Sequence, residues 1–121
     1  MKKILIIEDE ETISSMYKAG LEDEGHQIIV AKDGEEGFIK AKEGKPDLIL
    51  LDIILPKIDG FGVLKKLKED ATTKGIMVVM LTNLGQEDDK GKAKKIGAID
   101  YWVKADYTPS EVSKKIGKLL S

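Results

Sequence analysis

The sequence contains no cysteine, and aromatic residues make up only 5% of it. The absence of cysteine excludes a disulfide framework, a thiol nucleophile and a cysteine metal site, and it fits a reducing compartment. The single histidine, His26, lies near the start of a predicted strand. We interpret it as a surface residue, neither a metal ligand nor a catalytic base.

Long hydrophobic runs are also missing. The apolar run Ile4–Ile7 stops at four successive acidic residues, which is too short for a secretory signal peptide. No other run approaches the length of a membrane span. The 20 basic and 22 acidic residues give a net charge of −2, without the basic excess typical of nucleic-acid binding. We therefore expect a cytoplasmic protein with no membrane segment and no direct contact with nucleic acid.

The composition that remains is that of an ordinary globular domain. The 121 residues suggest one domain, 1–121, and 41% of them are hydrophobic. Short apolar runs alternate along the chain with segments of helical spacing. The predicted strands are Ile4–Ile7, Gln27–Ala31, Asp47–Asp52, Ile76–Thr82 and Ile99–Lys104. Such alternation predicts an α/β fold, a five-stranded parallel sheet with helices on both faces.

Helices are predicted after each strand. The first has an apolar face of Ile13, Met16, Tyr17 and Leu21, and Asp9 could cap it. The second covers 34–43 and the fourth 86–96, while Asp59 caps the third. The last begins at Pro109, with Thr108 and Glu111 as a capping box.

Chemically distinctive side chains lie at the carboxyl ends of four of the predicted strands. They are Glu8 and Asp9, Asp52, Thr82 and Lys104. Because ligands of open parallel sheets bind beyond the carboxyl ends of the strands, we expect these groups to converge. Two carboxylates 4 Å apart repel by about 4 kcal/mol at an effective dielectric of about 20. Either one carboxylate is protonated or a cation lies among them, and hard oxygen ligands favour Mg²⁺.

The same set suggests a reaction. Mg²⁺ in proteins usually takes one or two carboxylates and shares a phosphate oxygen, which leaves one carboxylate free as a nucleophile. Thr82 and Lys104 are suited to hydrogen-bond and neutralise phosphoryl oxygens. The residues therefore indicate transfer of a phosphoryl group to a carboxylate.

Five segments, in this order and spacing, resemble the receiver domain of two-component response regulators, from Lys3 to about Leu120. They are Ile4–Glu10, Pro46–Asp52, Leu55–Phe61, Leu81–Thr82 and Gly97–Lys104. The resemblance implies a flavodoxin-like strand order, 2-1-3-4-5. It also implies a signalling switch, phosphorylated by a sensor histidine kinase or a histidine phosphotransfer protein. Apart from self-catalysed phosphotransfer and slow autodephosphorylation, such a domain is not an enzyme.

The resemblance implies a role for each matching position. Asp52 would be the phosphoacceptor, Asp9 a direct Mg²⁺ ligand and Glu8 its outer partner. The backbone carbonyl of Ile54 would complete the metal site. Thr82 and Lys104 would contact the phosphoryl group.

Signal output is implied to involve the fourth helix, the fifth strand and the last helix, which would bind an effector protein. Tyr101 would be the aromatic residue that rotates inward when the Thr82 hydroxyl moves. Strand packing is an alternative explanation for Tyr101, and we expect Trp102, on the opposite face, to belong to the core.

Two positions depart from the family pattern. Ala105 replaces the usual proline that follows a cis bond, and since a cis non-proline bond costs about 3–4 kcal/mol, Lys104–Ala105 is either trans or strained. Asn83 replaces a small residue beside Thr82 and should slow exchange of the phosphoryl group. These departures leave an alternative open: a pseudo-receiver that docks a partner constitutively.

Overall fold

Five parallel strands form one sheet in the order β2-β1-β3-β4-β5, as expected. The computed structural model describes residues 2–121. The strands are β1 (Lys3–Ile7), β2 (Gln27–Ala31), β3 (Leu48–Leu51), β4 (Met77–Thr82) and β5 (Asp100–Val103). The helices are α1 (Glu11–Asp23), α2 (Gly34–Gly44), α3 (Gly60–Glu69), α4 (Glu87–Ile96) and α5 (Pro109–Leu120), and the short 3₁₀ helix η1 (Lys104–Asp106) precedes α5.

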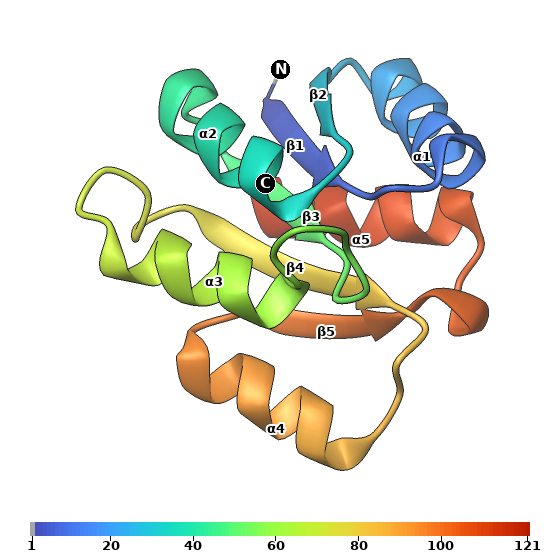
Figure 1. Cartoon of the computed structure of the whole chain (residues 1–121). Helices are drawn as coiled ribbons and strands as arrows, with labels where there is room; N and C mark the ends of the chain where they lie inside the picture. The colour runs from blue at the N-terminus through green and yellow to red at the C-terminus, as the bar shows by residue number, and fades with distance from the viewer. Residues whose placement is uncertain (1) are drawn as a thin grey trace.

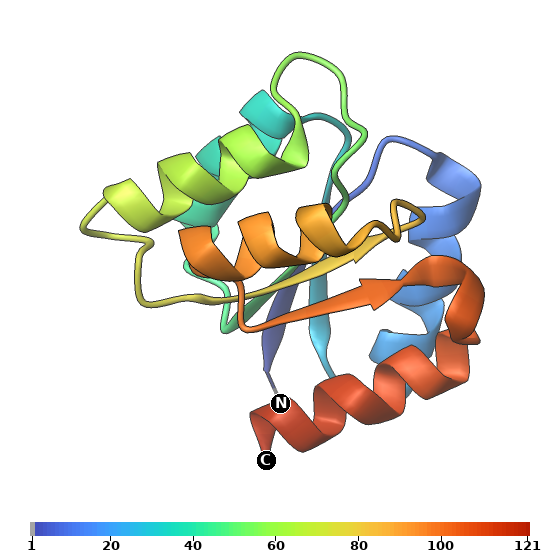
Figure 2. The same ribbon diagram turned by 90° about the horizontal axis from the view of Figure 1, so that it is seen from below.

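Helices cover both faces of the sheet: α2, α3 and α4 lie on one face and α1 and α5 on the other (Figures 1 and 2). Because side chains alternate along a strand, each face has its own core. Leu5 and Ile7 pack toward α2 and α3, and Ile4 and Ile6 pack toward α1 and α5. Trp102 is buried in the core beneath α1 and α5, as predicted. Since both faces are covered, chemistry is confined to the ends of the strands.

The first helix corrects the sequence prediction. Asp9 does not cap it: Glu10 is the N-cap residue, and no side chain caps that end. The buried stripe runs through Ser14, Tyr17 and Leu21, a spacing that turns Met16 outward, with 47% of its surface exposed. Asp9 is thus not needed by the helix.

Two other helix starts are confirmed. The Asp59 carboxylate accepts a hydrogen bond from Gly62 N at 2.9 Å, and Thr108 forms the capping box with Glu111. Three predicted strands extended too far: β3 excludes Asp47 and Asp52, β4 excludes Ile76, and β5 excludes Ile99 and Lys104. Asp52 and Lys104 leave the ladder because their polar side chains belong to the end of the sheet. His26 is half-buried, not a surface residue. Within residues 2–121, no helix is both long enough and apolar enough to cross a membrane.

Candidate functional site

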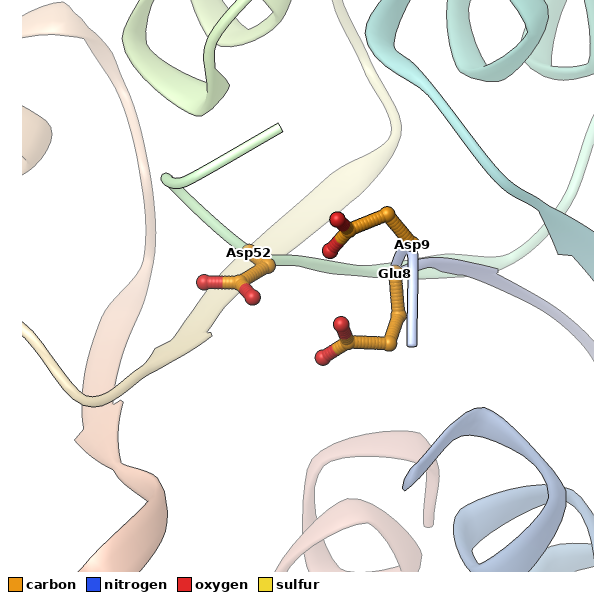
Figure 3. Close-up of side chains that lie close together, drawn as sticks. All are labelled: Glu8, Asp9 and Asp52. Carbon is orange, nitrogen blue, oxygen red and sulfur yellow. The ribbon is translucent and has the colours of Figure 1, made fainter. Parts of the chain in front are cut away.

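The three acids expected to converge do so. Glu8 follows β1 and Asp52 follows β3, and the last paired residues of these strands are Ile7 and Leu51. Carboxylate oxygens of Glu8, Asp9 and Asp52 lie within 4.8 Å of one another and face a common space (Figure 3). Glu8 and Asp52 are buried, whereas Asp9 is exposed. The strand pairing therefore builds an acidic cluster with one solvent-facing member.

Lys104 joins this cluster from the far edge of the sheet. Its ammonium donates hydrogen bonds to Asp52 Oδ2, at 2.9 Å, and to Glu8 Oε1. Burial disfavours the charged lysine, but the bonds to Asp52 and Glu8 outweigh it and raise the pKa of Lys104 above its usual value. Three carboxylates against one ammonium leave two negative charges formally uncompensated, which equals the charge of one divalent cation.

Main-chain groups fix the two buried acids. Ile53 N donates to Asp52 Oδ1 at 2.7 Å, and Glu10 N donates to Glu8 Oε2 at 3.0 Å. Burial raises the pKa of Glu8, although the hydrogen bond from Lys104 opposes the shift. Within residues 2–121, no ion pair engages Asp9. Asp9 is thus the carboxylate of the cluster most available to an added cation.

An open hollow of about 330 Å³ lies over the cluster. Its lining includes Asp9, Asp52, Ile54, Thr82, Asn83 and Lys104. Ile54 is 63% exposed and lines the hollow. Its side chain is a hydrocarbon, so its backbone carbonyl is the group suited to a metal. The structure therefore brings together every predicted site residue except Tyr101, with Glu8 beneath the hollow.

Tyr101 is connected to the hollow through Leu84. The Tyr101 hydroxyl donates to the Leu84 carbonyl oxygen, and Thr82 Oγ1 accepts a weak hydrogen bond from Leu84 N at 3.4 Å. Tyr101 is buried in the core under α2, α3 and α4, and burial raises its pKa to about 12. Sequence reasoning missed Leu84, since it acts through main-chain atoms that leave no pattern in the sequence.

The two departures from the family pattern contact each other. Asn83 Oδ1 accepts a hydrogen bond from Ala105 N at 3.1 Å. The Lys104–Ala105 bond is trans, since residues 2–121 contain no cis peptide bond. Their joint occurrence in the sequence was the only signal that could have suggested this contact.

Comparison with known proteins identifies relatives that match this chain over nearly its whole length. A family model described as response regulator receiver domain matches residues 4–116. The chain is 41% identical over 119 residues to the alkaline phosphatase synthesis transcriptional regulatory protein PhoP of Bacillus subtilis. The matched region covers 98% of this chain and 48% of PhoP. It is 42% identical over 106 residues to protein PilH of Pseudomonas aeruginosa, covering 86% of each. The chain thus spans about half of PhoP but most of PilH.

Solved structures agree with this result. A CheY-like response regulator receiver domain protein from Methanospirillum hungatei has a TM-score of 0.91 at 29% identity, covering 99% of this chain and 94% of that one. The Mn²⁺-bound form of response regulator Rcp1 has a TM-score of 0.85 at 28% identity, covering 99% and 94%. The likeness therefore extends over the sheet and all the strand ends that form the site.

Proposed function

The chain belongs to the response regulator receiver domain family, and from this membership we propose that it is a signalling switch in which Asp52 accepts a phosphoryl group. The observation that carries the proposal is the position of Asp52: buried, held by Ile53 N and Lys104, and adjacent to two further acids. A buried carboxylate beside like charges destabilises the fold, so we expect it to be retained for a function. Attack on phosphorus would be such a function.

The donor set fits Mg²⁺. The acidic cluster offers only carboxylate oxygens, its uncompensated charge is that of one divalent cation, and the similar Rcp1 structure is a Mn²⁺-bound form. Asp9, Asp52 and the Ile54 carbonyl would hold the ion, with Glu8 as their outer partner. When bound, Mg²⁺ supplies positive charge for the phosphoryl oxygens.

The chain's own residues then account for the transfer. A carboxylate oxygen of Asp52 forms a bond to phosphorus as the N–P bond of a donor phosphohistidine breaks, and the electron pair of that bond returns to the imidazole. The Lys104 ammonium balances charge on the transferred group, and the Thr82 hydroxyl donates a hydrogen bond to it. The proposed donor is a sensor histidine kinase or a histidine phosphotransfer protein.

Output is proposed to occur through α4, β5 and α5. Thr82 and Tyr101 both bond to Leu84, so movement of the Thr82 hydroxyl toward the phosphoryl group would disturb the partner of Tyr101. In α4, Ala93 is the one fully buried residue, so few apolar contacts restrain this helix. A weakly held helix next to a switch residue suits the binding of an effector protein.

We test the proposal by intact mass after incubation with Mg²⁺ and acetyl phosphate. We expect the native chain to gain one phosphoryl group, Asp52→Asn to gain none, and a chelator to abolish the gain. Asp47→Asn is the matched control: Asp47 lies at the other end of β3 and accepts from Lys3 N, which asparagine can still do. It should be phosphorylated like the native chain.

The second candidate, a constitutive docking module, rests on the two departures from the family pattern, Asn83 beside Thr82 and Ala105 after Lys104. No mass gain by the native chain, with Mg²⁺ binding established separately, would favour it over phosphotransfer.

A further inference from the structure

The bond between Asn83 and Ala105 joins two segments that are 22 residues apart in the sequence. It depends on both residue types. A proline at position 105 would have no N–H to donate, and a small apolar residue at position 83 would have no side-chain oxygen to accept. The two positions are thus a chemically matched pair.

The bond lies just beyond the end of the β4–β5 ladder, next to the segment that carries Lys104. β5 is an edge strand that pairs only with β4, and the last residue pair of that ladder is Thr82 with Val103. Beyond it, Lys104 begins η1, whose backbone bond from Tyr107 N to Lys104 O is long, at 3.3 Å. The Asn83 side chain therefore extends the β4–β5 connection past the end of the backbone ladder.

Lys104 needs this support because its ammonium acts far from its backbone. The side chain reaches across β4 to Asp52 and Glu8, and a lysine has many rotamers to lose when it is held in one place. A fixed backbone reduces the number of positions that the ammonium can occupy.

We propose that Asn83 is a positioning residue for Lys104: its side-chain carbonyl holds the Ala105 N–H and so fixes the segment from which the lysine reaches the phosphoacceptor. For its effect on phosphotransfer, this inference rests on the proposed function. It differs from a purely steric role, in which Asn83 narrows the hollow by its volume.

The experiment separates the two roles by substitution. Asn83→Leu keeps the number and branching of the side-chain heavy atoms, at a somewhat larger volume, but removes the acceptor; Ala105→Pro removes the donor, and a double variant combines them. Phosphorylation of each by acetyl phosphate with Mg²⁺ is followed over time. Gly85→Ala is the control in the same loop, because an added Cβ there lies 3.6 Å from its nearest neighbour, an ordinary contact.

A hydrogen bond of this kind contributes a factor of about three to ten in an equilibrium or rate. We expect each single variant to be phosphorylated about three to ten times more slowly, the double variant to be no slower than either single one, and Gly85→Ala to match the native chain. Native rates in both single variants, effects that multiply in the double variant, or equal slowing in Gly85→Ala would overturn the proposal.

A second measurement does not require phosphorylation. Hydrogen exchange of the Ala105 amide, followed by NMR on the unphosphorylated chain, should be about three to ten times faster in Asn83→Leu than in the native chain. The Lys104 ammonium resonance should shift in the same variant, which a change in volume alone would not produce. Unchanged exchange and an unchanged ammonium resonance would overturn the inference, even if the native chain accepts no phosphoryl group.

Discussion

A single residue, Tyr101, has two possible roles in the sequence, strand packing or switching, and its contacts bear on both. Its ring is part of the core under α2, α3 and α4, which accounts for packing. Its hydroxyl reaches the Leu84 carbonyl oxygen, in the loop that begins at Thr82. The ring of Tyr101 thus packs in the core, and the contact of its hydroxyl with Leu84 supports the proposed switch role.

Tyr101→Phe tests this residue through pH. The Tyr101 pKa rises to about 12 from an ordinary value of 10, so the protonated phenol is favoured in the folded state. Its contribution to stability is therefore fully present below about pH 10 and is lost as pH rises from about 10 to 12. We expect Tyr101→Phe to lose about 1 kcal/mol at pH 7, from the missing hydrogen bond, and to show a shallower alkaline decline.

Urea unfolding of both proteins at several pH values measures this effect. Equal slopes above pH 10 in the native chain and in Tyr101→Phe would contradict the burial of the phenol in solution.

At the scale of elements, the loop from β3 to α3 places Asp52 and Ile54. Gly60 begins α3 directly against this loop, and its N–H bonds to the Ile53 carbonyl at 2.8 Å. A Cβ at Gly60 would lie 2.2 Å from the Asp52 carbonyl oxygen. The helix start and the site are therefore in direct backbone contact, which only glycine permits.

Gly60→Ala should move this loop. We expect the variant to lose about 2 kcal/mol or more of stability, because the clash is with backbone that cannot rotate away, and to bind Mg²⁺ more weakly. Gly91→Ala in α4 is the matched control. Nothing lies within 4 Å of its added Cβ, so alanine should stabilise the helix by about 0.5–1 kcal/mol. Thermal unfolding with and without Mg²⁺ measures both, and native-like values for Gly60→Ala would contradict the contact.

At the scale of the whole molecule, the site exists only because four strands end at one edge of the sheet. Glu8 and Asp9, Asp52, Thr82, and Lys104 come from the ends of β1, β3, β4 and β5. The fold holds acids together that repel, so the metal-free protein is under electrostatic stress. A bound cation should relieve this stress for the whole domain.

Mg²⁺ should therefore raise the melting temperature, because mass action stabilises the folded chain by about 2.7 kcal/mol at a hundred times its Kd. Asp9→Asn should lose most of this stabilisation, yet be slightly more stable than the native chain without metal, by up to about 1 kcal/mol, since one repelling charge is gone. Calorimetry with Mg²⁺ and with a chelator measures both the stabilisation by Mg²⁺ and the stability of each protein without metal. Undiminished stabilisation of Asp9→Asn would remove Asp9 from the metal site.

The amino-acid sequence was enough to predict the class of the fold and which side chains gather at the carboxyl edge of the sheet. Apolar runs and helical spacing are local, and polar residues at the ends of strands 1, 3, 4 and 5 identify the carboxyl edge without knowledge of contacts. Parallel strands that are buried on both faces leave only that edge for chemistry, so Glu8, Asp9, Asp52, Thr82 and Lys104 could be named in advance.

What those residues contact became visible only in the three-dimensional arrangement of the chain. The Lys104 ammonium lies between Glu8 and Asp52, Leu84 connects Thr82 with Tyr101, and Asn83 binds the Ala105 amide. Asp9 was free for the site because α1 begins one residue later than its carboxylate suggested. Each of these contacts joins segments far apart in the chain or depends on a backbone position within one residue. Local sequence patterns carry neither kind of information, because the contacts depend on how the strands pair and the helix start depends on the path of the backbone after β1.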